Sequence, residues 1–208
     1  LVADGLGGFA SGAADGIRTR RYHALLLVAS PFDERRYVLV NDMEAWLERG
    51  TQGARIPLSS HRYHPGVIHP DGATRLKRFD AEPWPTWSYD AGEGREVVQQ
   101  LFIPRTTERA ATVMEWQLVS PGQRAGLTIS LHARLLLSGR DFHALHHENP
   151  YFALEPEKLG PQSWSWQPYA GIPPIVVHAN ATYQHEPLWF RQFQYDEETA
   201  RGLDDTED

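Results

Sequence analysis

Short runs of β-branched and aromatic residues, separated by turn residues, constrain this chain more than any other feature of its sequence. Eight such runs lie at residues 22–29, 37–40, 73–79, 96–103, 111–119, 127–137, 175–178 and 188–195. Turn signals such as Asp71-Gly72 and Ser138-Gly139 separate them. Strand-length runs with frequent glycine and proline are typical of antiparallel sandwiches and barrels. Fifteen prolines argue against long helices. We therefore expect an all-β fold, an antiparallel β-sandwich with long loops and little helix.

The end of the chain differs from the rest in composition. Residues 196–208 hold seven acids and one arginine, which leaves the remainder close to neutral although the net charge is −7. A run of acids is usually a solvated segment. We expect one β domain over residues 1–195, with a weak break at 150–161, and an acidic connector over 196–208, or a short helix there.

Composition excludes several classes of function. The nearly neutral body has no basic surface to collect phosphates, so we expect no nucleic-acid partner. No apolar stretch approaches the roughly 20 residues that span a bilayer, so we expect no membrane partner. The absence of cysteine excludes disulfides and thiol chemistry. The chain begins at Leu1 rather than Met, and we expect it to be a fragment.

Residues 4–23 form a glycine-rich segment that ends in cations, an aromatic residue and a histidine. Its five glycines precede Arg18, Arg20, Arg21, Tyr22 and His23, and a hydrophobic run follows at once. Arginine presents a rigid fork of donors that suits carboxylates and hydroxyl-rich partners. The segment lacks the spacing of a phosphate-binding loop or a dinucleotide fingerprint. We expect a loop that holds polar side chains at the end of a strand.

Several histidines and carboxylates are candidate site residues. Metal ligands could come from the histidine spacings His61-x-x-His64 and His143-x-x-His146-His147. Pro65 and Gly66 instead indicate a turn, which favours polar histidines in loops. We therefore expect no metal and no cofactor. Asp42, Glu44 and Asp141 are the candidate carboxylates for glycoside hydrolysis, yet no spacing among them indicates a catalytic pair. We expect no catalytic residue.

Two aromatic clusters could contact a sugar. Trp84, Trp87 and Tyr89 form one of them, and Trp164, Trp166 and Tyr169 form the other. Flat aromatic faces suit the apolar faces of sugar rings, but large aromatics also fill ordinary β cores. Alternate residues of a strand share a face, so Trp164 and Trp166 can point to one side, whereas Trp84 and Trp87 cannot. Core packing and sugar stacking both stay open for these four side chains.

Seven characteristic segments are spread over the chain from end to end: DGLGGFASG (4–12), TRRYHALL (19–26), LVNDMEAWL (39–47), HRYHPG (61–66), PWPTWSY (83–89), SGRDFHALH (138–146) and ARGLDDTED (200–208). Together they resemble the N-terminal domain of bacterial and archaeal-type glycogen debranching enzymes. Asp4 and Ala24 depart from the family's usual Asn and Gly, and these changes affect only the fine geometry of the loop.

The resemblance implies a β-sandwich of the supersandwich type that precedes a helical (α/α)6 domain. In that family the helical domain supplies the acids that hydrolyse α-1,6 branches. It implies a non-catalytic, cytoplasmic domain of an amylo-α-1,6-glucosidase that supports this C-terminal helical domain of the same polypeptide and helps to shape the α-glucan cleft. The residues expected to bind substrate or to form the domain interface are Arg20, Arg21, Tyr22, His23, Asp141 and His143. The same residues could instead form an internal polar network that holds the loop.

Two other classes of protein remain as alternatives. An autonomous carbohydrate-binding module would expose Trp84, Trp87, Trp164 and Trp166. A metal-dependent enzyme of the double-stranded β type would require the histidines to converge. Exposure of the tryptophans and the placement of the histidines separate these alternatives.

Overall fold

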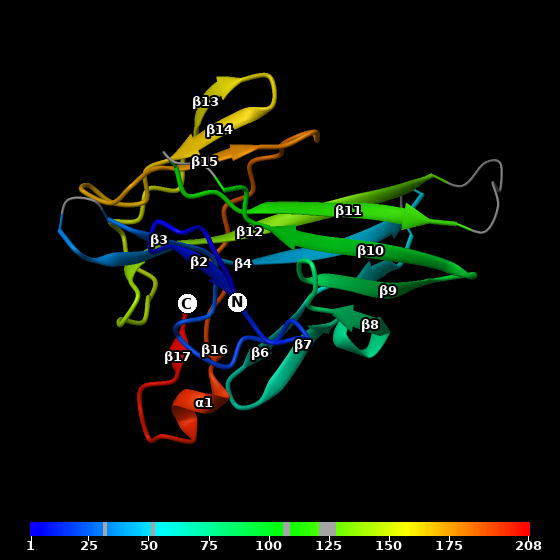
Figure 1. Ribbon diagram of the computed structural model, residues 1–208, viewed down its shortest axis with the longest axis horizontal. Helices are drawn as coiled ribbons and strands as arrows, with labels where there is room; N and C mark the ends of the chain where they lie inside the picture. Colours follow the sequence, from blue (N-terminus) through cyan, green and yellow to red (C-terminus); the bar gives the residue numbers. More distant parts are fainter. Residues whose placement is uncertain (31–32, 51–52, 106–108, 121–127) are drawn as a thin grey trace.

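A computed structural model describes residues 1–30, 33–50, 53–105, 109–120 and 128–208. Antiparallel sheets account for nearly all of its regular structure, which confirms the expected all-β class (Figure 1). Helix in the described residues is limited to a single 3-10 turn, η1 (Ala73–Arg75), and one turn of α-helix, α1 (Asp196–Thr199).

The largest sheet has the order β1-β2-β3-β4-β12, with β5 beside β4. Its strands are β1 (Val2–Ala3), β2 (Phe9–Ser11), β3 (Ala24–Ala29), β4 (Arg36–Arg49), β5 (Arg55–Pro57) and β12 (Ile129–Asp141). The long strands β4 and β12 pair along nearly their whole length, from Ile129 opposite Arg49 to Asp141 opposite Tyr37. These two strands run through the middle of the molecule and connect its regions (Figure 1).

A second sheet packs on one part of β4. It has the order β11-β10-β9-β8, formed by β8 (Leu76–Asp80), β9 (Thr86–Gly92), β10 (Arg95–Phe102) and β11 (Val113–Val119). Leu47 of β4 is buried against Tyr89 and Val97 of this sheet. Burial of large apolar side chains between two sheets is the main stabilising term of a sandwich.

Two small sheets lie at opposite ends of the view in Figure 1. The three-stranded sheet at the top contains β13 (Glu157–Gly160), β14 (Ser163–Trp166) and β15 (Ile175–His178). The four-stranded sheet at the bottom has the order β17-β16-β6-β7, and its strands are β6 (Ser60–Tyr63), β7 (Val67–Asp71), β16 (Phe193–Gln194) and β17 (Thr206–Glu207).

The sequence located most of the long strands and missed several short ones. The run at 175–178 coincides with β15, whereas the run at 188–195 contains only the two residues of β16. Leu127, at the start of one expected strand, lies outside the described residues. The weak break at 150–161 falls mainly in the irregular segment 142–156, although β13 begins within it.

The expected turn at Ser138-Gly139 is wrong, because both residues lie inside β12. The β4–β12 register shifts between Leu137 and Arg140, and Gly139 has a φ of 127°. A Cβ on Gly139 would lie 3.0 Å from the ring of Pro168, so a side chain there would be crowded as well as strained by the positive φ. The irregularity is a β-bulge, and bulges redirect the side chains beside them. Arg140 is consequently buried at 5% exposure.

The expectation of a solvated acidic segment at 196–208 is wrong for two of its seven acids, and the short helix given as the alternative is present as α1. Glu198 and Glu207 are only 1% and 0% exposed. Strand β17 pairs with β16, and the Glu197 backbone N–H donates to the Thr19 carbonyl at 3.0 Å. The segment therefore packs against the loop near residues 18–23, and a role as a connector toward a helical domain stays a prediction.

Candidate functional site

The glycine-rich segment forms two connected loops around β2. The Asp4 carboxylate accepts hydrogen bonds from the backbone N–H groups of Leu6 and Gly8, at 2.6 and 2.9 Å. A Cβ on Gly8 would lie 2.4 Å from the Asp4 carboxylate and 2.6 Å from the Leu27 carbonyl, so only glycine fits. An Asx-type turn thus closes the first loop and holds it against β3.

Arg18 is the innermost residue of the second loop. Its Nε donates to Asp42 Oδ2 at 3.0 Å, and its Nη1 donates to the side-chain carbonyl of Asn41. Burial alone would lower the pKa of Arg18, but the nearby Tyr195 and Asp42 outweigh it and hold the pKa above the ordinary value. Burial likewise opposes ionisation of Asp42, and Arg18 nevertheless keeps the pKa of Asp42 below the ordinary value. This pair anchors the loop to β4.

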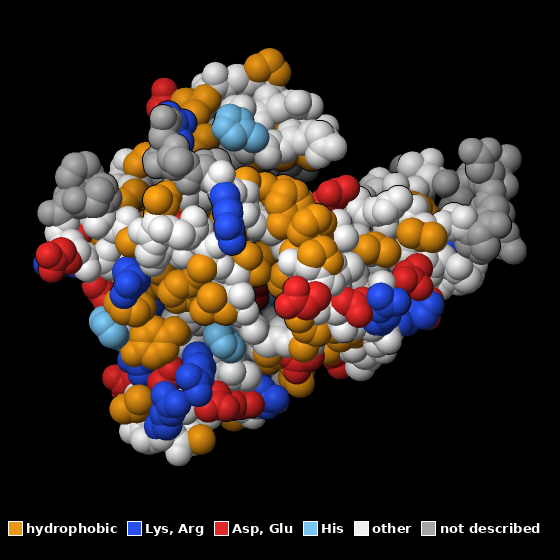
Figure 2. All heavy atoms as spheres, viewed as in Figure 1, with side chains coloured by type: hydrophobic (Ala, Val, Ile, Leu, Met, Phe, Trp, Pro, Cys, Tyr) orange, Lys and Arg blue, Asp and Glu red, His pale blue; other side chains and the backbone are white. Residues whose placement is uncertain are grey.

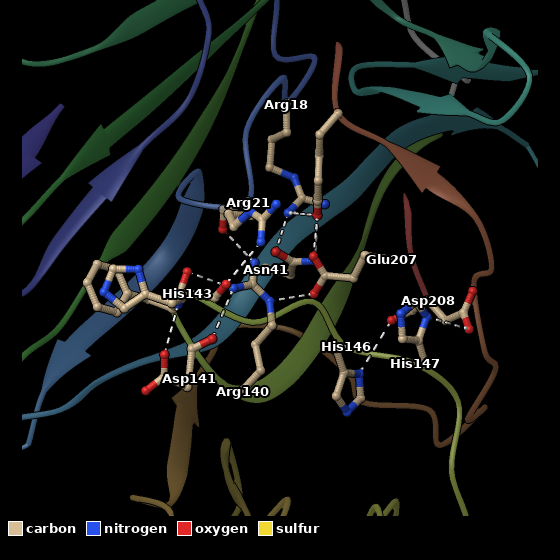
Figure 3. A network of polar contacts seen from close by, with 12 residues as sticks. Arg18, Arg21, Asn41, Arg140, Asp141, His143, His146, His147, Glu207 and Asp208 are labelled. Carbon is tan, nitrogen blue, oxygen red and sulfur yellow. Dashed lines mark hydrogen bonds and ion pairs between the residues drawn. The ribbon is translucent and has the colours of Figure 1, made fainter. Parts of the chain in front are cut away.

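A second buried ion pair joins β12 to the end of the chain (Figure 3). Arg140 Nε donates to Glu207 Oε1 at 2.6 Å, and the two side chains are 2% and 0% exposed. The other Glu207 oxygen accepts from the Tyr195 hydroxyl at 2.5 Å, and Asn41 Nδ2 donates to that hydroxyl at 3.4 Å. Asn41 and Tyr195 therefore connect the two ion pairs into one cluster.

Arg21 fastens the loop to the end of the chain from the outer side. Its Nη1 and Nη2 donate to the backbone carbonyls of His143 and Asp204, at 3.1 and 2.8 Å. Its Nε lies 3.5 Å from Glu198 Oε2, and its own carbonyl accepts from Arg140 Nη2 at 2.6 Å. The two Nη groups donate to carbonyls and Nε faces the Glu198 carboxylate, so this guanidinium is occupied by contacts within the protein.

The remaining loop residues lie nearer the surface. The Tyr22 hydroxyl lies 3.2 Å from His143 Nδ1, and the Asp141 carboxylate accepts from the His143 backbone N–H at 2.9 Å. Arg20 forms an ion pair with Glu197 at 3.3 Å, and its side chain is 40% exposed. His143 is exposed and Tyr22 is half-buried. Arg20, Tyr22 and His143 form what we call the loop rim.

His23 lies under the loop and is held neutral. Its Nδ1 accepts a hydrogen bond from the Thr19 backbone N–H at 3.2 Å. Burial, and then the positive charges of Arg18 and Arg20, lower the pKa of His23 to about 4. The neutral ring acts as an acceptor inside the loop, since protonation would remove the lone pair that Thr19 uses.

These contacts hold the loop of residues 18–23 in place and leave the loop rim at the surface. Arg18, Arg21 and Arg140 each face a carboxylate or a carbonyl, and the buried acids Glu198 and Glu207 each face an arginine. The structure thus gathers the sequence-predicted residues Arg20, Arg21, Tyr22, His23, Asp141 and His143 into one region. Figure 3 shows Arg21, Asp141 and His143 of this group. A role of these residues in substrate binding or domain contact stays a prediction.

Comparison with known families decides the assignment. The family model described as "Glycogen debranching enzyme N terminal" matches residues 1–208, which is the whole chain. The chain belongs to the glycogen debranching enzyme N-terminal family. No curated protein and no solved structure matches it.

Within this debranching-enzyme N-terminal domain the histidines do not converge. Over the described ranges, no group of three or more His, Asp and Glu side chains is placed to hold a metal ion. His61 was expected in a polar loop, and that is wrong: it lies in β6, 3% exposed, with its ring 5.6 Å from that of Phe193. His146 donates to or accepts from the Tyr169 hydroxyl at 2.5 Å and stacks on Trp189. A turn does follow His64, as expected.

The four tryptophans expected as possible sugar-stacking residues differ in exposure. Trp164 and Trp166 lie on one face of β14, as their spacing predicted, and they are buried at 8% and 6% exposure. Their burial favours core packing. Trp84 is 40% exposed, and Trp87 donates from its indole N–H to the Ala14 carbonyl in the glycine-rich segment at 2.8 Å. Direct sugar stacking by these four residues stays a prediction.

Sequence reasoning missed the residues that hold the loop of this domain. These are Arg18, Asn41, Arg140, Tyr195, Glu198 and Glu207. Asn41, Arg140 and Glu207 lie within the segments that carry the family resemblance, which was an available signal. Glu198 lies outside those segments, and it had no signal because its surroundings resemble any solvated acidic segment. No helix in the described residues has the length and apolar character needed to cross a membrane.

Proposed function

We propose that this chain is the non-catalytic N-terminal domain of an amylo-α-1,6-glucosidase in the cytoplasm. It supports a C-terminal helical catalytic domain of the same polypeptide, and its loop rim contributes to the cleft that receives the α-glucan. The helical domain and the glucan are its partners, and it requires no cofactor for this role.

One observation carries this proposal. The arginines on the inner side of the loop are consumed by internal pairs, whereas Arg20, Tyr22 and His143 are left together at the surface. Buried ion pairs seldom add much net stability, but they define one geometry for the groups they hold. A rigidly held set of donors and an aromatic ring is what recognition of a hydroxyl-rich ligand requires.

The test uses the intact debranching enzyme that carries this domain. Tyr22→Phe and His143→Ala each remove a polar group of the loop rim without disturbing a buried side chain. Each is expected to raise KM for a branched dextrin several-fold, in line with the loss of about 1 kcal/mol for one hydrogen bond, with no change in Tm.

The matched control is Tyr151→Phe, which removes a hydroxyl from a tyrosine that is 82% exposed outside the loop rim. Unchanged kcat and KM in both rim variants would contradict a part for this loop in the cleft. Release of glucose from branched dextrin by the 208-residue chain alone would contradict the non-catalytic role.

A further inference from the structure

A surface groove lies along the three-stranded sheet, which stands at the top of the view in Figure 1. Its volume is about 660 Å³, within the range of small-molecule sites. Trp164 and Tyr183 line it together with Pro156, Lys158, Gln162 and Thr182. None of the residues that line this groove takes part in the ion pairs that hold the loop.

Tyr183 forms an aromatic platform that is supported from beneath. Its ring centroid lies 5.0 Å from that of Trp164 at an interplanar angle of 43°, and 5.8 Å from that of Trp166 at 79°. Both tryptophans belong to the buried cluster that contains Tyr37 and Ile175. Tyr183 itself is 36% exposed, although residues 180–188 form no helix or strand. An irregular segment thus presents one aromatic ring in a defined position.

The hydroxyl group of Tyr183 is held as well. It lies 2.8 Å from His185 Nδ1, and His185 Nε2 lies 3.2 Å from Glu155 Oε1. A ring fixed at its face by tryptophan and at its hydroxyl by histidine loses little further freedom when a ligand binds. Preorganisation of this kind favours affinity.

The polar groups of the groove indicate the class of ligand. Lys158, Gln162 and Thr182 offer an ammonium, a carboxamide and a hydroxyl, and no carboxylate lies among the groove's lining residues. A pyranose ring has one face of C–H groups, which packs on an aromatic ring, and a rim of hydroxyls, which require mixed donors and acceptors.

We propose that this groove is a second carbohydrate site, which holds a neutral α-glucan chain on the exposed ring of Tyr183. The choice of an α-linked glucan rests on the proposed function, whereas the platform and its polar rim do not. A site separate from the loop rim would retain a polymeric substrate at the domain surface and would leave the reaction itself unchanged.

The test is a titration of the 208-residue chain with maltoheptaose, followed by tryptophan fluorescence because Trp164 lies in the groove. A saturable change is expected, and cellohexaose should bind about tenfold more weakly. Tyr183→Ala should weaken maltoheptaose binding by about tenfold, which corresponds to 1.4 kcal/mol and to the scale of one aromatic contact. Tyr151→Ala is the matched control and should bind like the parent chain.

Each outcome decides the proposal. Absence of binding by the parent chain, or unaltered binding by Tyr183→Ala, would overturn it, and preferential binding of a decaproline peptide would replace the sugar by a proline-rich partner. Should Tyr183→Ala melt at a lower temperature, Gln162→Ala and Thr182→Ala serve instead, because both side chains are exposed. Each of these is expected to weaken binding about threefold, and no change in either would overturn the proposal.

Failure of this groove and failure of the proposed function are distinguishable. The loop rim is tested by KM of Tyr22→Phe and His143→Ala in the intact enzyme, and the groove is tested by binding to Tyr183→Ala. A raised KM in the rim variants with unaltered maltoheptaose binding by Tyr183→Ala would leave only the rim proposal standing. Weakened binding by Tyr183→Ala with unchanged KM in the rim variants would leave only the groove proposal standing.

Discussion

The two ends of the molecule are held together by different forces. Beneath the loop rim, buried ion pairs connect residues 18–23 with β4 and with the end of the chain, and connect β12 with the end of the chain. At the three-stranded sheet, Trp164 and Trp166 pack against Tyr37 and Ile175 without an ion pair among them. In Figure 2, basic and acidic side chains lie together at the lower end of the view, and a second such group lies at its right.

The difference between these regions concerns direction. An arginine side chain donates hydrogen bonds in fixed directions, so its acceptors must lie at set positions. The charged region is therefore held in a single geometry. Apolar packing depends mainly on volume and tolerates replacement by a similar side chain. The loop rim is therefore suited to recognition at a fixed place, and the small sheet is suited to support an exposed ring.

The largest expected effect comes from breaking the charged region at its centre. Arg140→Met would leave the Glu207 carboxylate buried without its cation, and such uncompensated charges cost about 3–5 kcal/mol. The measurement is the free energy of unfolding from urea titration. Arg20→Met is the matched control, because its pair with Glu197 is largely exposed, and it is expected to cost less than about 1 kcal/mol.

Addition of Glu207→Gln to Arg140→Met is expected to restore at least about half of that loss. It removes the unpaired charge and keeps a carbonyl oxygen for the Tyr195 hydroxyl. Equal losses in Arg140→Met and Arg20→Met would show that the buried pair has no special weight, and the contrast between the two ends would disappear.

A smaller effect is expected at the aromatic end. Trp166→Phe keeps an aromatic ring in the buried cluster and is expected to cost about 1–2 kcal/mol through the space left behind. Trp84→Phe is the control, since that side chain is 40% exposed, and its unfolding midpoint should hardly move. A loss in Trp166→Phe as large as that in Arg140→Met would mean that packing here is as specific as the ion pairs.

The smallest effect concerns pH and belongs to the charged end alone. Folded His23 has a pKa of about 4, so the unfolded chain takes up the proton first as the pH falls. The contribution of His23 to the free energy of unfolding is thus complete above about pH 6.5 and is lost between about pH 6.5 and 4. We expect this loss to be roughly 1 kcal/mol, because solvent screens a part-exposed ring.

Replacement of His23 by asparagine keeps an acceptor for the Thr19 N–H and removes the titration. Urea unfolding of both proteins at pH 7 and pH 4 gives the comparison, in which the variant should lose less stability than the parent. An identical loss in both proteins would assign the acid sensitivity to other groups.

The sequence could predict the apolar end better than the charged end. The spacing of Trp164 and Trp166 places both on one face of a strand, because side chains alternate along a strand with a period of two. That rule needs only neighbours in the sequence. It does not reveal Tyr183, whose position depends on an irregular segment and on two tryptophans of another strand.

At the charged end the sequence indicated the loop but not what holds it. Arg21, Tyr22 and His143 were expected as site residues, whereas Glu198 and Glu207 were expected in solvent. An acidic side chain is buried only where a cation meets it, and the cations here come from distant parts of the chain. The bulge at Gly139, which turns Arg140 inward, likewise resembled a turn in the sequence.

The ties between Arg21 and Glu198, and between Arg18 and Tyr195, span 177 residues each. Contacts so distant in sequence require closure of almost the entire chain, and proteins dominated by such contacts fold slowly. As the ribosome releases this polypeptide, residues 18–23 emerge early but have no partners until residues 195–207 follow. The loop that is synthesised first is therefore among the last parts of the domain to acquire its shape.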